Sequence, residues 1–380
     1  MNSSKQLTTW EASCIISGYG IGAGVLSMPW LASRCGLPLS ILILLLALLA
    51  SYGLHIMIAD LAIKSPGGSQ LVACLEHFLF RGKHKRALTL TFFLMMALIF
   101  ITNLAAYVSG AAEVLVDLLP LSPFAAKLLF YVAAASVVLL GLKAVGVFEK
   151  IAMAGIFILI AVLAAGSLLA EKQPLPLRCA SPSAALAFYG MAMFALAAFF
   201  SVPQAVEGLG GDSRRIRRAV FQGLLNTFFI NVVVIFFALL SSREVTEVAM
   251  VGWSGGVGEW ARLVGCLFTV LAMLTTYWSL SLALADTVQE VLHPGKNLSW
   301  LLATLPSLLL VLFDLTGFMD LMRTAGGLIA IVISFMIIPT YRNACREVPG
   351  TLLPVSGRGT ELAVLAAYLL MAVGSVVPVA

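Results

Sequence analysis

Residues 17–36 read SGYGIGAGVLSMPWLASRCG, and the interpretation of the whole chain starts from this stretch. Four glycines alternate with other residues and a proline follows them: Gly18, Gly20, Gly22, Gly24 and Pro29. Each glycine costs a helix about 1 kcal/mol relative to alanine, so we expect a helix to unwind over residues 19–24. A dinucleotide-binding loop is disfavoured because no strand precedes the glycines. Close helix packing through small residues is the second alternative, but it requires neither four glycines nor the proline.

The composition places this stretch in a membrane protein. Of 380 residues, 61% are hydrophobic and 11% are charged, whereas soluble domains have about 45–50% and about 25%. A helix needs about 20 apolar residues to cross a bilayer. Long windows free of Asp, Glu, Lys and Arg occur at residues 12–33, 35–59, 87–112, 128–142, 151–170, 179–206, 219–242, 263–285, 297–313, 324–341 and 362–380. We therefore expect an all-α integral membrane protein with eleven transmembrane helices, and not an outer-membrane barrel.

The positive charges predict the orientation. With the N-terminus in the cytoplasm, most of the 23 Lys and Arg residues fall on the inner side, including the runs RGKHKR (81–86) and RRIRR (214–218). This bias follows the positive-inside rule, so the basic runs anchor helices near lipid headgroups and imply no nucleic acid. We expect a multi-pass protein of the plasma (inner) membrane, with its N-terminus in the cytoplasm and its C-terminus outside.

A second, weaker interruption lies in the sixth window. The segment ALAFYGMAMFALAAFFSVPQAVEGLGG (185–211) contains Gly190, Ser201 and Pro203, and the proline removes a backbone donor. The two interruptions lie five windows apart, an odd number, so equivalent helices of two five-helix halves would cross the membrane in opposite directions. Broken helices at matching positions of an inverted repeat indicate a transporter's binding site at the bilayer midplane. We expect residues 1–171 to form the first half, 172–341 the second, and 342–380 an additional helix.

The sequence resembles a known transporter superfamily. The 17–36 stretch is similar to the first helix of the amino acid, polyamine and organocation transporters, especially the bacterial aromatic and hydroxy amino acid permeases and the amino acid/auxin permeases. LTTYWSLSLALADTVQEV (274–291) and FFSVPQAVEGLGGDSRRIRRAV (199–220) resemble their eighth and sixth helices. The resemblance implies a leucine-transporter-like fold with broken helices one and six. Those permeases often have a polar residue at the sixth-helix break, where this chain has Ala197, Ala198, Phe199 and Phe200.

The candidate substrate site combines the two breaks with nearby aromatic residues. No ionised residue lies near the middle of helices one, three, six or eight, so a zwitterion with a neutral side chain fits best. A half-helix N-terminus near Gly24 would hold its carboxylate, and carbonyls at the end of the preceding half-helix would face its ammonium group. The candidate residues are Tyr19, Gly20, Ile21, Gly22, Ala23, Gly24, Tyr107, Phe194, Ala198, Phe199 and Ser201.

The coupling ion is left open between sodium and proton. Thr275 and Thr276, with oxygens of Ser17 and Gly20, form a candidate sodium site of hard oxygen ligands. The fifth window contains no lysine, and His55 is expected to make a structural hydrogen bond rather than relay protons. Asp60, Glu207 and Asp286 are either gating residues at the inner side or solvated helix ends.

These observations predict a cation-coupled secondary transporter that imports a neutral amino acid by alternating access. Its partners are the amino acid, the cation and the bilayer, with no cofactor. A large or aromatic amino acid is favoured, and a small one such as serine or alanine is the alternative. A membrane-embedded enzyme would need clustered His, Asp or Glu at bilayer depth, and a channel would need a filter motif or a ring-forming charged helix. Cys35 and Cys179 either pair near the outer face or stay free.

Overall fold

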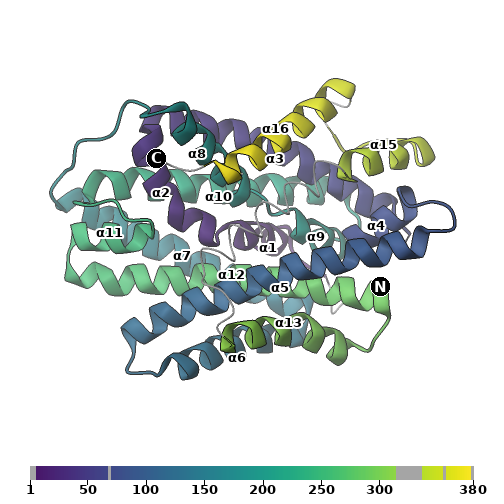
Figure 1. Ribbon diagram of the computed structural model, residues 1–380, viewed down its shortest axis with the longest axis horizontal. Coiled ribbons are helices and arrows are strands. Elements are labelled where there is room, and N and C mark those ends of the chain that lie inside the picture. The colour runs from purple at the N-terminus through teal and green to yellow at the C-terminus, as the bar shows by residue number, and fades with distance from the viewer. Residues whose placement is uncertain (1–5, 67–69, 314–335, 354–356, 378–380) are drawn as a thin grey trace.

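The computed structural model describes residues 6–66, 70–313, 336–353 and 357–377, and within these ranges its regular structure is entirely helical. The helices (Figure 1) are α1 Thr9–Gly20, α2 Ala23–Cys35, α3 Leu37–Lys64, α4 Leu71–Phe78, α5 Lys85–Leu118, α6 Pro123–Leu140, α7 Leu142–Leu169, α8 Pro182–Ala195, the 3-10 turn η2 Phe199–Ser201, α9 Val202–Gly208, α10 Ser213–Ser241, α11 Ala249–Val257, α12 Glu259–Leu292, α13 Lys296–Leu312, α15 Ile338–Glu347 and α16 Arg358–Val376.

The described helices account for most of the predicted spans. Eight of them, counting α8 to α9 as one, are long and apolar enough to cross a membrane, and the bent pair α1–α2 makes up to nine. The apolar helix α13 is shorter, at 17 residues. The predicted tenth window, residues 324–341, lies mostly outside the described residues. The all-helical membrane fold is confirmed, and the count of eleven stays a prediction.

Both predicted interruptions are confirmed. Helix α1 ends at Gly20 and α2 begins at Ala23, and the two half-helices meet at an angle of 56°. The second break follows Ala195, where α8 ends and the short η2 turn leads into α9. Pro203 is the second residue of α9, a position whose N–H has no partner within a helix. The proline therefore starts a new half-helix instead of disrupting one.

Helix lengths repeat between the two halves in the way that an inverted repeat requires. After the first break come helices of 28, 34 and 18 residues, α3, α5 and α6. After the second break come helices of 29, 34 and 17 residues, α10, α12 and α13. Within the described residues, each half thus has one broken span followed by three helices of matching length, and the exact bounds of the two halves stay a prediction.

Helix α1 lies at the centre of the bundle (Figure 1), packed against α7, α9, α10 and α12. Almost all of its residues are buried, whereas the surface of α3 exposes leucines. Leu42 and Leu49, for example, are 51% and 62% exposed. Exposed leucines suit contact with lipid tails, and the buried α1 places its break in the protein interior.

Candidate functional site

A small cavity lies at the break between α1 and α2. Its volume is about 20 Å³, and residues from α1, α2, α5, α8 and α12 surround it. The lining residues are Tyr19, Gly20, Gly22, Gly24, Asn103, Tyr107, Phe194, Ala195, Ala197, Thr276 and Leu280. Both breaks thus contribute to one cavity, as the sequence predicts for the two halves of a transporter.

The glycines are required because other groups stand where their side chains would be. A Cβ atom on Gly22 would lie 2.7 Å from the Tyr107 hydroxyl and 2.8 Å from Thr276 Oγ1. A Cβ on Gly20 would lie 2.9 Å from the Ala195 carbonyl oxygen. The break of α1 therefore packs directly against α5, α8 and α12, and its backbone can face the cavity.

Three of the predicted aromatic residues, Tyr19, Tyr107 and Phe194, line the cavity. Phe199 does not line it: its side chain is fully buried and packs against Phe200 and His55, with ring centroids 4.4 Å and 6.1 Å away. Phe200 also contacts Phe100 at 4.6 Å, so these phenylalanines form an aromatic cluster beside the cavity rather than its wall. His55 makes the expected structural hydrogen bond, from Nδ1 to the Ser51 carbonyl oxygen at 2.6 Å.

The other predicted substrate residues lie close to the breaks but not in the cavity wall. Ile21, Ala198 and Ser201 are fully buried, and the Ser201 hydroxyl donates to the Ala198 carbonyl at 2.6 Å. The side chain of Ala23 is outside the described part of the structure. Gly20, Gly22 and Gly24 do line the cavity, so the first-helix motif contributes more of the site than the sixth helix does.

Among the oxygens of the candidate sodium site, Thr276 Oγ1 makes a hydrogen bond between two helices, and Thr275 Oγ1 and the two Ser17 oxygens make hydrogen bonds within their own segment. Thr276 Oγ1 donates to the Gly18 carbonyl at 3.0 Å and so joins α12 to α1. Thr275 Oγ1 donates to the Ala272 carbonyl of its own helix at 2.9 Å. The Ser17 carbonyl accepts the Ile21 N–H at 3.0 Å, and the Ser17 hydroxyl donates to the Ser13 carbonyl at 2.9 Å. The sodium site stays a prediction.

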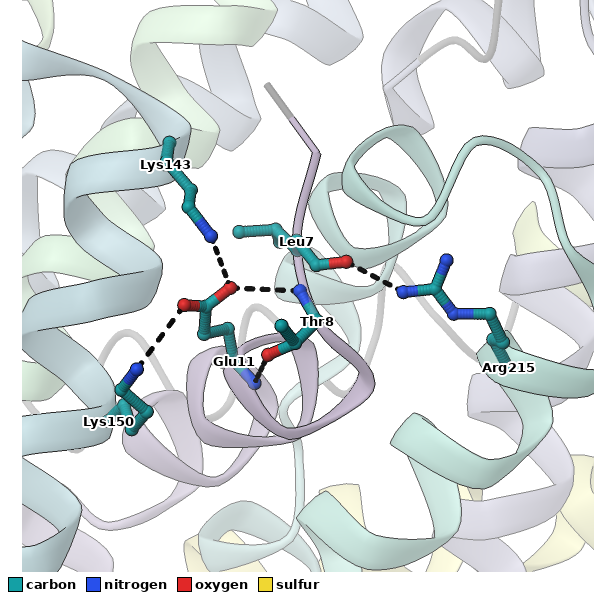
Figure 2. Close-up of polar contacts among 6 residues, drawn as sticks. All are labelled: Leu7, Thr8, Glu11, Lys143, Lys150 and Arg215. Carbon is teal, nitrogen blue, oxygen red and sulfur yellow. Dashed lines mark hydrogen bonds and ion pairs between the residues drawn. The ribbon is translucent and has the colours of Figure 1, made fainter. Parts of the chain in front are cut away.

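Three basic residues, Lys143, Lys150 and Arg215, lie at the end of the bundle where α1 and α7 begin, which we call the basic end. Figure 2 shows a lock at this end that sequence reasoning missed, formed by Leu7, Thr8, Glu11, Lys143, Lys150 and Arg215. Glu11 accepts from Lys143 Nζ at 2.6 Å and from the Thr8 N–H at 2.8 Å, and it pairs with Lys150 at 3.5 Å. Arg215 donates to the Leu7 carbonyl at 2.8 Å. The lock ties the start of α1 to α7 and α10.

The gating role of Asp60, Glu207 and Asp286 stays a prediction. Asp60 pairs with Lys64 on its own helix at 2.8 Å, and Lys64 also donates to the Gly350 carbonyl at 2.6 Å. Glu207 lies in α9 and Asp286 near the end of α12, and both have interaction partners. Cys35 and Cys179 are free thiols.

Two buried polar residues, one in the cavity wall and one outside it, carried no usable signal in the sequence. Asn103, on α5, lines the cavity, yet a single asparagine in an apolar helix forms no motif. Glu149 is completely buried on α7 beside α1 and α12. Glu149 lies just before the fifth charge-free window, which begins at residue 151, so its sequence position resembles that of a charged helix end.

Comparison with solved structures shows the fold. MhsT, solved in complex with L-phenylalanine, is 18% identical with a TM-score of 0.63, and the match covers 97% of both chains. Mhp1, a nucleobase-cation-symport-1 family transporter, is 11% identical with a TM-score of 0.67, covering 99% of this chain and 94% of that one. A manganese transporter of Eremococcus coleocola is 16% identical with a TM-score of 0.64, covering 97% and 85%. The chain has the leucine-transporter-like fold of these transporters.

Comparison of sequences shows the family. Tyrosine-specific transport system 1 of Haemophilus influenzae is 26% identical over 371 residues, which cover 90% of both chains. The family model of the tryptophan/tyrosine permeases matches residues 5–346. The chain therefore belongs to the tryptophan/tyrosine permease family and is a multi-pass membrane transporter rather than an enzyme.

Proposed function

We propose that this permease imports an aromatic amino acid together with a cation, by alternating access to a site at the α1–α2 break. The observation that carries the proposal is the cavity, where unwound backbone and the rings of Tyr19, Tyr107 and Phe194 face one space. An amino acid offers a carboxylate, an ammonium group and a side chain, and each needs a different kind of partner.

The main-chain charges of the substrate suit the ends of the two half-helices. Amides at the start of α2 carry a partial positive charge for the carboxylate, and carbonyls at the end of α1 carry a partial negative charge for the ammonium group. The lining residues in the described part of the chain include no Asp, Glu, Lys, Arg or His. A substrate with a charged side chain would meet no counter-charge there, which favours a neutral one.

The aromatic rings favour an aromatic side chain. Pairs of aromatic rings packed edge-to-face or offset contribute about 0.5–1.5 kcal/mol beyond the area they bury. The family, the named specificity of the Haemophilus influenzae relative and the phenylalanine bound to MhsT support the same choice over serine or alanine. The cavity, at about 20 Å³, is far smaller than such a substrate, so binding requires movement of the surrounding half-helices.

The cation, the superfamily and the orientation belong to the same proposal. A gradient of sodium or protons would drive accumulation, and the fold supports membership of the amino acid, polyamine and organocation superfamily.

The four arginines of residues 214–218 begin α10 at the basic end, together with Lys143 and Lys150. By the positive-inside rule we place the basic end and the N-terminus in the cytoplasm and the C-terminus outside, with the protein in the plasma membrane.

Counterflow tests this function directly. Purified protein in liposomes loaded with unlabelled tyrosine, tryptophan, phenylalanine, serine, alanine, glutamate or lysine is mixed with external radiolabelled tyrosine. We expect transient uptake of label with the three aromatic amino acids inside and none with the other four. Equal uptake with serine or alanine would contradict aromatic selectivity, and no counterflow with any amino acid would contradict the proposed function.

A further inference from the structure

The inference concerns Glu149, a carboxylate in the interior of the bundle that the substrate site does not use. Glu149 is the eighth residue of the membrane-spanning helix α7, about 10 Å along that helix from the basic end. Its side chain is 0% exposed. It reaches the α1 backbone at Gly18, where a Cβ atom would lie only 2.0 Å from Glu149 Oε2. Only glycine at position 18 leaves room for this carboxylate. Gly18 lies two residues before the end of α1, where the break begins.

The hydrogen bonds around Glu149 have more acceptors than donors when its carboxylate is ionised. Ser279 Oγ, on α12, lies 2.6 Å from Glu149 Oε1 and 3.2 Å from the Ile15 carbonyl oxygen of α1. When Glu149 is ionised, Glu149 Oε1 and the Ile15 carbonyl oxygen are both acceptors. The Ser279 hydroxyl has one hydrogen, so it can donate to only one of them. Among the residues that the structure describes, Glu149 Oε2 has no hydrogen-bond partner. A proton on Glu149 Oε1 would be donated to Ser279 Oγ, and the Ser279 hydroxyl could then donate to the Ile15 carbonyl. Glu149 Oε1, Ser279 Oγ and the Ile15 carbonyl oxygen would then each have a partner.

The charged residues nearby do not neutralise Glu149. The helices packed against α7 are α1, α6, α9, α10, α11 and α12. Their titratable residues are Glu11, Cys14 and Tyr19 on α1, Lys127 and Tyr131 on α6, Glu207 on α9, Arg214, Arg215, Arg217 and Arg218 on α10, and Glu259, Arg262, Cys266, Tyr277, Asp286 and Glu290 on α12. Cys14 is near enough to interact electrostatically with Glu149 and Lys150. Lys150, the next residue of α7, pairs with Glu11. Within the described residues, no Lys, Arg or His nitrogen lies within 4.0 Å of the Glu149 carboxylate.

We propose that Glu149 is the proton-binding site that couples substrate import to a proton gradient. The inference rests on the proposed transport function and names its coupling ion as a proton. Glu149 takes a proton from water at one side of the membrane as the substrate binds, and it releases that proton to water at the other side as the substrate leaves. No other bond forms or breaks.

The coupling follows from the position of Glu149 between moving parts. An isolated ionised carboxylate is strongly destabilised in a dry interior, so α1 packs closely on α7 and α12 only when Glu149 is neutral. Loss of the proton favours separation of α1 from α7 and entry of water from the basic end. Gly18 belongs to the half-helix that ends at the substrate cavity, so the same movement of α1 opens the substrate site. Proton and substrate are therefore released by one change.

Glu149→Gln tests the proposal because the amide has the shape of the protonated acid but cannot release a proton. Liposomes with the membrane potential clamped receive a gradient of one pH unit, which can sustain about tenfold accumulation at one proton per substrate. We expect the unsubstituted protein to accumulate tyrosine and Glu149→Gln to show counterflow but no accumulation. Glu113→Gln, an exposed carboxylate on α5, should leave both activities unchanged.

The alternatives give different results. Accumulation by Glu149→Gln equal to that of the unsubstituted protein would overturn the assignment, and its loss in His55→Gln instead would move the proton site to α3. Accumulation driven by sodium and indifferent to pH would overturn proton coupling and support the threonine site. If Glu149→Gln does not fold, Glu149→Asp replaces it in the test. This variant keeps an ionisable acid, so it should retain pH-driven accumulation. Accumulation by Glu149→Asp that is driven by sodium or independent of pH would equally overturn the proposal. Absence of tyrosine counterflow in the unsubstituted protein would instead contradict the proposed function.

Discussion

At the scale of single residues, the sequence predicts best where the residue type itself limits the structure. The alternating glycines of residues 18–24 predict the broken helix because helices disfavour glycine, and three of them line the cavity. Phe194 and Phe199 show the limit of this reasoning. Both lie near the second break, yet Phe194 lines the cavity and Phe199 is buried against His55. Which way an aromatic side chain points depends on tertiary packing, which one sequence does not specify.

Gly22→Ala should weaken substrate binding. The added methyl group would lie 2.7 Å from the Tyr107 hydroxyl and 2.8 Å from Thr276 Oγ1, so the break and its neighbours must separate. We expect tyrosine affinity to fall by about 5-fold to 150-fold, since overpacking costs about 1–3 kcal/mol. Gly255→Ala, which has open space around its Cβ, is the matched control for equilibrium binding to purified protein. Unchanged affinity in Gly22→Ala would show that the substrate binds elsewhere.

Phe194→Ala should change the ranking of substrates. Removing this ring from the cavity takes away an aromatic contact of about 0.5–1.5 kcal/mol, which is up to about tenfold in affinity for tyrosine. Competition of tyrosine, phenylalanine and leucine for labelled tyrosine uptake measures the change, and leucine should gain relative to tyrosine. Phe229→Ala, 56% exposed on α10, should keep the original ranking. Equal changes in both variants would mean that general packing was disturbed.

At the scale of helices, charge-free windows locate the spans but not their ends. The third window covers residues 87–112, whereas α5 runs from Lys85 to Leu118, because its charged ends extend beyond the apolar layer. The short helices α4 and α11, of 8 and 9 residues, are shorter than a membrane span and have no long charge-free window of their own. The lock at the basic end was also missed. Lys143 is 132 residues from Glu11 in sequence, and only the packing of α1 against α7 brings them together.

Glu11→Gln should open the basic end. The substitution removes a charge that Lys143 and Lys150 share, and a hydrogen bond to a charged group contributes about 1.5–3 kcal/mol, or about 10-fold or more in the closed-to-open ratio. Cys14, one turn further along α1, is 0% exposed and reports the opening. We expect faster alkylation of Cys14 by N-ethylmaleimide, followed by peptide mass spectrometry.

Asp117→Asn is the control for the lock. Asp117 pairs with Arg262 between α5 and α12, away from the lock, and both side chains are more than half exposed. Exposed pairs contribute about 1 kcal/mol or less, so alkylation of Cys14 should be unchanged. The lock would have no gating role if Cys14 reacted at the same rate in Glu11→Gln and in the unsubstituted protein.

At the scale of the whole molecule, the order of apolar helices and breaks carries more information than residue identity. The chain is 11–18% identical to solved transporters whose fold it shares over nearly its whole length. The inverted repeat was predictable because two interruptions lie an odd number of spans apart. The buried carboxylate at Glu149 was not, because its neighbours Gly18 and Ser279 come from helices distant in sequence.

The central claim is that the substrate lies at the α1–α2 break, and a structure determined with bound L-tyrosine tests it most directly. We predict density for tyrosine between Gly20–Gly24 and the rings of Tyr107 and Phe194. The carboxylate should face the start of α2 and the ammonium group the end of α1. Tyrosine bound at another place, or an unbroken helical hydrogen-bond ladder through Gly20 to Gly24, would contradict the claim.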